Sequence, residues 1–205
     1  MPRIYLVRHG ETRANAEMRY QGQNDTPLSE AGIEQAQRLA ERLRSEAIER
    51  LICSDLARAW QTAEPVAQAL GLAITPDERL REIDVGEWEG LTFGEIEQRY
   101  PALAAEWDHA GPEVRIPGGE SANDVARRAE AVLAELRSAP DESSILLVTH
   151  GGWVQTFMCV ALGVELQRRY QFRVRNTAVS IVSLYGEFAL LDLFNDAHHL
   201  KGLAG

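Results

Sequence analysis

The chain contains 205 residues, of which 45% are apolar and 25% are charged. These fractions are typical of an ordinary globular protein and exclude a disordered, collagen-like or fibrous chain. The formal net charge of -10 makes a surface that repels nucleic acids and anionic lipids. We therefore expect no nucleic-acid partner and no membrane partner. The pairs Arg127-Arg128 and Arg168-Arg169 are interpreted as solvated helix faces.

The cysteines and the N-terminal segment indicate the cellular compartment. Cys53 and Cys159 each lie in an apolar run, which predicts two buried thiols and no disulfide. The apolar N-terminal segment becomes charged at Arg8, too early for the apolar region of a signal peptide. No apolar stretch approaches 18 residues, so we expect no membrane-spanning helix. These features predict a cytoplasmic protein.

The first half of the chain alternates short apolar runs with helical patterns. The runs predict buried strands at residues 4–7 and 51–53 and a weaker strand at 73–75 that ends at Pro76. Apolar residues at helical spacing follow the first two strands. They predict one helix capped by Ser29 and a second helix capped by Ser54 or Asp55. The second helix is expected to run to about Leu70 and to end at Gly71.

The second half begins with an irregular segment over residues 77–120 and then regains the alternation. The elements predicted here are helices at 92–99, 102–109, 121–137 and 153–162 and strands at 145–149, 178–185 and 187–194. Strands that alternate with helices predict an α/β fold with a parallel sheet, and the closing hairpin about Gly186 adds antiparallel pairing. We therefore predict a three-layer α/β/α sandwich with a mixed, mostly parallel sheet.

Cationic side chains follow three of the predicted strands. The first strand ends at Arg8 and His9, the second leads to Arg58 within one helical turn, and a third ends at His150. Ligands of open α/β sheets bind beyond the carboxyl ends of the strands. A single histidine there is most often structural, but arginine forks and helix N-termini together favour an anion. The pattern predicts a small phosphorylated metabolite as ligand.

At these residues the sequence resembles the histidine phosphatase superfamily, the phosphoglycerate mutase-like group. The matching blocks follow the family's order over nearly the whole chain, at residues 6–12 with Asn15, 28–32, 54–59, 61–63, 80–90, 117–121 and 148–152. The resemblance implies the phosphoglycerate mutase-like fold and one histidine phosphatase domain over residues 1–205. Residues 83–123 would form a lid or specificity segment.

The resemblance also assigns the chemistry. His9 would be the nucleophile that becomes phosphohistidine, and Glu82 would donate and accept the proton. Asp84, Glu87 and Glu89 are rivals to Glu82, which holds the matching family position. The resemblance implies phosphate contacts from Arg8, Asn15, Gln21, Arg58, His150 and the backbone N–H of Gly151.

This chemistry sets several expectations for the site. A neutral His9 needs its second ring nitrogen to donate to a fixed acceptor such as a backbone carbonyl. A protonated His150 would join the two arginines in neutralising the phosphate. Because these groups supply the charge, we expect no metal and no cofactor. Glu11 is interpreted as loop scaffold, and His198-His199 as a polar tail.

Three functions remain open. A metal-independent phosphatase for small monoesters is favoured, because residues 83–90 resemble the family's small phosphatases and the segment before His150 is short. A 2,3-bisphosphoglycerate-dependent phosphoglycerate mutase is the alternative. A non-catalytic phosphometabolite-binding protein is the second alternative, disfavoured because every catalytic position is filled. Arg115 is a candidate contact for a second negative group, and both a monomer and a homodimer are open.

Overall fold

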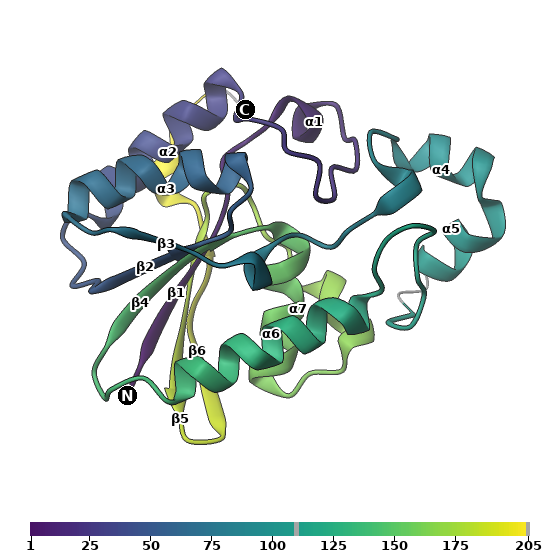
Figure 1. Cartoon of the computed structure of the whole chain (residues 1–205). Coiled ribbons are helices and arrows are strands. Elements are labelled where there is room, and N and C mark those ends of the chain that lie inside the picture. The colour runs from purple at the N-terminus through teal and green to yellow at the C-terminus, as the bar shows by residue number, and fades with distance from the viewer. Residues whose placement is uncertain (109–110, 204–205) are drawn as a thin grey trace.

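A six-stranded sheet lies at the centre of the computed structural model, which describes residues 1–108 and 111–203 (Figure 1). The strands are β1 (Arg3–Arg8), β2 (Arg50–Cys53), β3 (Ile74–Pro76), β4 (Ser144–Thr149), β5 (Val179–Tyr185) and β6 (Phe188–Asp196). They lie in the order β3-β2-β4-β1-β5-β6. The first four in that order pair in parallel, and β5 and β6 are antiparallel. The predicted mixed, mostly parallel sheet is confirmed.

Helices cover both faces of this sheet (Figure 1). α2 (Glu30–Leu43) and α3 (Ala57–Leu70) pack on one face, and α6 (Ala122–Arg137) and α7 (Gly151–Leu162) pack on the other. Neighbouring residues of β1 point to opposite faces, so Val7 packs with α2 and α3 while Leu6 packs with α6 and α7. A strand buried on both faces explains the continuous apolar run. The three-layer α/β/α fold is confirmed.

Two helix starts differ from the prediction. The expected caps Ser54 and Asp55 are wrong for α3, which begins at Ala57. The Ala57 N–H donates instead to Asp25 Oδ1 at 2.6 Å, from a loop distant in sequence. α7 begins two residues early, at Gly151. A further short helix, α1 (Arg13–Ala16), was not predicted, and it is closed by a capping box between Thr12 and Asn15.

A second, smaller group of elements lies beside the sandwich (Figure 1). It contains α4 (Phe93–Arg99), α5 (Pro101–Asp108) and the 3-10 turn η2 (Gly86–Trp88). The 3-10 turn η1 (Glu78–Leu80) packs instead against α6 of the sandwich. The helix predicted to reach His109 is α5, and His109 itself lies outside the described residues. Trp88, Ile96 and Trp107 form the centre of a separate apolar cluster in this group. At Gly86 a Cβ would lie 2.2 Å from the Pro117 carbonyl oxygen, so the base of the segment needs glycine.

The arginine pairs are a correction, because one member of each is not on a solvated face. Arg128 donates to the carbonyl oxygens of Arg79 and Arg81 and pairs with Glu120. Arg169 lies in the 3-10 turn η3 (Leu166–Gln171) and is buried. Helical spacing cannot show this, because both guanidinium groups reach partners on other elements.

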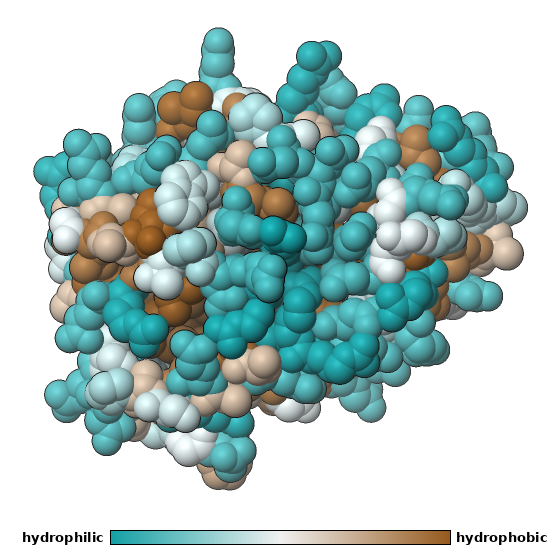
Figure 2. Space-filling view, viewed as in Figure 1, coloured by the Kyte–Doolittle hydropathy of each residue, from teal (hydrophilic) through white to brown (hydrophobic). Residues whose placement is uncertain are grey.

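Two remaining predictions concern the thiols and the surface. Cys53 and Cys159 are buried and free, as predicted. Among the described residues, no helix combines the length and the apolar character needed to cross a membrane. Figure 2 shows a face dominated by hydrophilic side chains, with hydrophobic ones in scattered patches.

Candidate active site

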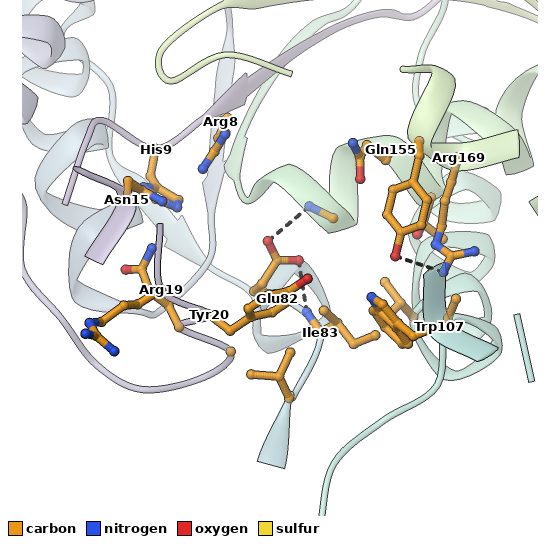
Figure 3. A pocket seen from close by; sticks show the side chains of 18 of the residues that line it. Arg8, His9, Asn15, Arg19, Tyr20, Glu82, Ile83, Trp107, Gln155 and Arg169 are labelled. Atoms are coloured by element: carbon orange, nitrogen blue, oxygen red, sulfur yellow. Dashed lines mark hydrogen bonds between the residues drawn. The ribbon is translucent and has the colours of Figure 1, made fainter. Parts of the chain in front are cut away.

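A cavity of about 670 Å³ lies beyond the carboxyl ends of β1, β2 and β4. It is lined by six of the residues expected from the sequence, namely Arg8, His9, Asn15, Gln21, Arg58 and Glu82. Figure 3 shows Arg8, His9 and Asn15 together at one end. The sheet therefore brings residues from distant parts of the chain to one cavity, as the strand-end argument predicted.

His9 is buried at the end of β1. Its backbone N–H donates to the Thr149 carbonyl oxygen of β4 at 2.8 Å. Its Nδ1 lies 2.6 Å from the Gly10 carbonyl oxygen, which accepts only if Nδ1 carries the proton. Burial, and then the charges of Arg58 and Arg8, hold the pKa of His9 well below 6.5. The ring is therefore neutral, with Nε2 unprotonated and able to act as a nucleophile.

The two arginines bring buried positive charge to the same end. Arg58 Nη1 and Nη2 donate to the carbonyl oxygens of Asn24 and Gly22 at 2.8 and 2.7 Å, and Arg8 Nη1 donates to Val174 at 2.9 Å. Burial lowers the pKa of Arg58 to about 10 and lowers that of Arg8, so both stay protonated. The Nε–H groups of both are buried without a partner among the described residues. Buried donors normally find an acceptor, and a phosphate oxygen is one.

Two side-chain amides complete this end, and their orientation follows from their neighbours. Gln21 Oε1 accepts from Thr12 Oγ1 at 2.8 Å and from Thr26 Oγ1 at 2.7 Å. Asn15 Oδ1 accepts from the Thr12 N–H at 3.1 Å and from Asn176 Nδ2 at 3.4 Å. Because both oxygens are held by donors, the two NH2 groups are the ends that remain for the cavity. The wall around His9 therefore presents donors.

Thr12, Thr26 and Asn176 are functional neighbours that the sequence analysis missed. Thr12 is fully buried and lies inside the recognised motif. The three-residue spacing from Thr12 to Asn15 is that of a capping box, and this signal could have found it. No local signal marks Asn176, which reaches Asn15 from 161 residues away.

Glu82 is held at the N-terminus of α7. Its Oε2 accepts from the Gly152 N–H at 3.0 Å, and its Oε1 accepts from the Trp153 N–H at 3.1 Å. A Cβ on Gly152 would lie 2.6 Å from Oε1, so the absence of a side chain there permits the approach. Figure 3 shows the carboxylate between the two ends of the cavity.

The rival carboxylates have other partners. Asp84 accepts from the Gly86 N–H, Glu87 from the Tyr100 hydroxyl, and Glu89 from the Gln23 N–H. None of the three is among the residues that line the described cavity. The geometry favours Glu82 as the proton-transfer group.

His150 and Gly151 differ from the expectation. His150 is fully buried behind the cavity wall, with its ring centroid 5.2 Å from that of His9 and its Nε2 2.8 Å from Ser54 Oγ. Burial, and then Arg58 and His9, hold its pKa well below 6.5. Burial therefore favours a neutral His150 in the ligand-free protein, and its protonation beside a bound phosphate stays a prediction. Gly151 is also outside the lining, which Gly152 reaches instead.

The cavity is also lined by residues to which the sequence analysis gave no role in the site. They are Met18, Arg19, Tyr20, Phe93, Trp107, Gln155, Thr156, Arg169 and Tyr170. In Figure 3, Arg19 lies on the side of Asn15, and Trp107 and Arg169 lie at the other end. Arg115 does not join them. It is exposed and pairs with Asp124 at 2.5 Å, so its interpretation as an anion contact in this cavity is wrong.

Two further residues were candidates for other roles. Glu11 Oε1 accepts from Ser29 Oγ at 3.0 Å, as a scaffold residue would. His199 Nε2 lies 3.2 Å from Thr177 Oγ1. Within residues 1–108 and 111–203, no group of three or more His, Cys, Asp or Glu side chains is placed to hold a metal ion.

Comparison with known proteins identifies the family. The sequence matches the family model of the histidine phosphatase superfamily (branch 1) over residues 4–197. The chain belongs to this superfamily. A curated histidine phosphatase relative, the probable phosphoglycerate mutase GpmB of Proteus mirabilis, is 37% identical over 209 residues, which cover 100% of this chain and 97% of that protein.

Solved structures of the superfamily are similarly close. Bacillus stearothermophilus YhfR has a TM-score of 0.91 and 33% identity, with 98% of this chain and 100% of that chain covered. Mycobacterial glucosyl-3-phosphoglycerate phosphatase in complex with VO3 has a TM-score of 0.88 and 33% identity, with 95% and 99% covered. The relatives thus include a protein named as a mutase and one named as a phosphatase.

Proposed function

We propose that the protein is a metal-independent phosphatase that hydrolyses small phosphate monoesters through a phosphohistidine on His9. The observation that carries the proposal is the neutral His9 ring, whose Nδ1 faces the Gly10 carbonyl oxygen at 2.6 Å. An imidazole in this state offers an unprotonated Nε2 beside two buried arginines. That combination serves nucleophilic attack on a phosphate dianion.

In the first step, Arg8, Arg58 and the NH2 groups of Asn15 and Gln21 hold the phosphate oxygens. His9 Nε2 attacks phosphorus, the N–P bond forms, and the ester O–P bond breaks. The bonding pair moves to the leaving oxygen, which receives a proton from the Glu82 carboxyl group. The bound dianion also favours protonation of the neighbouring His150, which offsets the burial that keeps this ring neutral without ligand.

In the second step, a water molecule takes the place of the leaving alcohol. The Glu82 carboxylate accepts a proton from this water as its oxygen attacks phosphorus, and the N–P bond breaks. His9 returns to its neutral form, Glu82 is again protonated, and inorganic phosphate leaves. The arginines supply the positive charge that a metal ion supplies in other phosphatases, so the proposal includes no metal and no cofactor.

The phosphoglycerate mutase activity is the second candidate, and the name of the curated relative favours it. Two observations support hydrolysis instead, namely the phosphatase-like sequence after Glu82 and the wide cavity beneath residues 83–123. We propose that this segment is the lid of one domain spanning residues 1–205. We further propose a cytoplasmic monomer or homodimer acting on a small phosphorylated metabolite.

The test is to trap the intermediate. Enzyme mixed briefly with a monoester and quenched should carry acid-labile, base-stable phosphate on His9, detected by intact mass and peptide mapping. His9→Ala should not be labelled, whereas the matched control His199→Ala, outside the cavity, should be. EDTA should leave both labelling and phosphate release unchanged. Phosphate on a different residue would overturn the proposal, and interconversion of phosphoglycerates far faster than phosphate release would favour the mutase.

A further inference from the structure

The proposed lid contacts both ends of the cavity. Arg8 and His9 lie at the phosphate end, and Trp107, which belongs to the lid, lies at the far end (Figure 3). Glu89 also belongs to the lid, but its carboxylate is bonded to a loop at the phosphate end. The proposed reaction gives this carboxylate no part. Its contacts therefore decide whether it has another role in the site.

The Glu89 carboxylate holds the loop of residues 20–27 through two backbone donors. Glu89 Oε1 accepts from the N–H of Gln23 at 3.0 Å and from the N–H of Asn24 at 3.1 Å. The same loop carries Gln21, which lines the cavity and is expected to bind phosphate. Hydrogen bonds to an ionised acceptor are stronger than those between neutral groups, so Glu89 is a firm anchor for this loop.

The other side of this loop accepts from Arg58. Arg58 Nη2 donates to the Gly22 carbonyl oxygen at 2.7 Å, and Nη1 donates to the Asn24 carbonyl oxygen at 2.8 Å. The Gly22 carbonyl and the Gln23 N–H are the two ends of one planar peptide group. This peptide group therefore lies between the Arg58 guanidinium and the Glu89 carboxylate, with its oxygen toward the cation and its N–H toward the anion. Hydrogen bonds in such a chain polarise and strengthen one another.

The backbone at Gly22 permits the close approach of loop and lid. Its φ of +55° lies in the left-handed region that favours glycine. A Cβ at this position would lie 2.7 Å from Glu89 Oε1 and 2.7 Å from Val85 Cγ2. Any other residue would therefore push the carboxylate away from the two N–H groups.

The Arg58 guanidinium depends on these contacts because it is buried. It is 1% exposed, and burial lowers its pKa to about 10. The Glu89 carboxylate is among the negative charges that oppose this fall of the pKa. With both terminal nitrogens bonded to the loop, the plane of the guanidinium is fixed. Its Nε–H, which has no partner among the described residues, is a donor that remains for a phosphate oxygen.

We propose that Glu89 is a positioning residue for the phosphate end. Through the peptide group between Gly22 and Gln23, its carboxylate fixes the Arg58 guanidinium. The same anchor holds the loop that carries Gln21. This inference rests on the proposed phosphatase function and gives a role to a side chain that is not among those lining the described cavity. It also couples the lid to phosphate binding, because a lid that moves away removes the anchor of the loop.

Two substitutions separate the charge of Glu89 from its ability to accept hydrogen bonds. Glu89→Ala removes the acceptor and should lower kcat/KM for monoesters about 10- to 100-fold. Glu89→Gln keeps a neutral acceptor of the same shape and should lower kcat/KM about 3- to 10-fold. Glu87→Gln is the matched control from the same segment, since Glu87 is exposed and accepts from the Tyr100 hydroxyl. It should keep the wild-type kcat/KM.

Inhibition by inorganic phosphate distinguishes positioning from a loss of folded protein. A variant with fewer folded molecules has a lower Vmax but an unchanged Ki for phosphate. Displacement of Arg58 and Gln21 weakens the phosphate contacts themselves, so Glu89→Ala should raise this Ki about 10-fold. The loss of kcat/KM should be equal for ethyl and 2-phenylethyl phosphate, because both present the same phosphate group. If Glu89→Ala does not fold, Glu89→Gln gives the same comparison.

A double variant shows whether Glu89 acts through Arg58. In an Arg58→Ala background, Glu89→Ala should lower kcat/KM by roughly twofold or less, because the contact that it disturbs is already gone. An undiminished further loss would contradict the route through Arg58.

The outcomes distinguish this inference from the proposed function. An unchanged Ki for phosphate in both Glu89 variants would overturn the positioning role, whatever happens to Vmax. A loss confined to 2-phenylethyl phosphate would also overturn it, because the effect would then arise at the far end. In either case phosphate release and labelled His9 in the wild-type enzyme would keep the phosphatase. A wild-type enzyme that neither hydrolyses monoesters nor becomes labelled on His9 would overturn the phosphatase and the inference with it.

Discussion

The two ends of the cavity are built in different ways. At the phosphate end, Arg8 and His9 stand at the end of the buried strand β1, and backbone hydrogen bonds join this strand to β4. Arg8 lies in register with Thr149, and the His9 N–H donates to the Thr149 carbonyl oxygen. At the far end, the walls come from α4, α5 and η3, outside the sheet. The sheet positions the reacting groups, while the segments outside the sheet determine which substrates fit the rest of the cavity.

This difference has a physical basis. Displacing a strand end disturbs both faces of the sheet, because β1 packs between two helical layers. The cover has its own small apolar cluster around Trp88 and Trp107. Side chains there can change with little consequence for the sheet. Substitutions at the phosphate end should therefore lower the rate for every substrate, and those at the far end should change the order of substrates.

The largest effect we predict is that of Glu82→Gln. The amide keeps the shape of the carboxyl group but cannot transfer its proton, so kcat for alkyl phosphates should fall about 10²- to 10⁴-fold. The fall should be smaller for p-nitrophenyl phosphate, whose leaving oxygen needs little protonation. Steady-state kinetics with both substrates measure the difference.

Glu87→Gln is the matched control, since Glu87 is exposed and bonded to Tyr100 away from the cavity. It should retain the wild-type kcat. Equal losses for good and poor leaving groups in Glu82→Gln would contradict its role as the general acid.

A smaller effect is predicted for Thr12, which tests whether the donor wall depends on its hydroxyl. Thr12→Val removes one of the two hydroxyls that donate to Gln21 Oε1 and leaves only that of Thr26, so the amide is held less firmly with its NH2 group toward the phosphate. A hydrogen bond to a charged group contributes about 1.5–3 kcal/mol, so kcat/KM should fall roughly 10- to 100-fold. The loss should appear with every monoester, whatever its alcohol.

Thr12→Ser restores the hydroxyl and should recover most of the activity, which a packing defect alone would not allow. Thermal melting shows whether both variants fold. Equal loss in Thr12→Val and Thr12→Ser would mean that Thr12 acts through packing.

The sequence predicted the fold well because its signals are local and periodic. The apolar run of β4 and the helical spacing of apolar residues in α2 can be recognised without tertiary information. The start of α3 was missed because its first N–H bonds Asp25, far away in the chain. Arg169 was misread for the same reason, since its burial comes from contacts with Trp107 on another element.

The site was predictable to the extent that it stands on motifs. His9, Arg58 and Glu82 lie on matching blocks and do line the cavity. The ionisation of His150 was not predictable, because it depends on complete burial beside other cations. Nor was Asn176, whose partner is defined only by the folded chain.

The third prediction concerns pH and belongs to the phosphate end alone. Burial holds the pKa values of His9 and His150 well below 6.5 in the folded protein. Below pH 6.5 the unfolded chain therefore binds protons that the folded chain does not. The free energy of unfolding consequently decreases as the pH is lowered. Each histidine contributes up to about 1.4 kcal/mol per pH unit. Urea unfolding between pH 7 and pH 5 measures this slope, which His150→Gln should reduce. An identical slope in the variant would refute the burial argument.

The smallest effect is predicted for Arg115, and it tests whether this side chain contacts the bound substrate. The Arg115 side chain is 57% exposed and pairs with Asp124, and it lies outside the cavity. Surface substitutions of this kind change stability by about 0.5 kcal/mol or less. Arg115→Gln should therefore keep KM for 3-phosphoglycerate and for 2-phenylethyl phosphate within twofold of wild type. A large rise for 3-phosphoglycerate alone would show that Arg115 reaches the substrate when the cover closes. The far end would then offer the carboxylate of 3-phosphoglycerate a second cation besides Arg169.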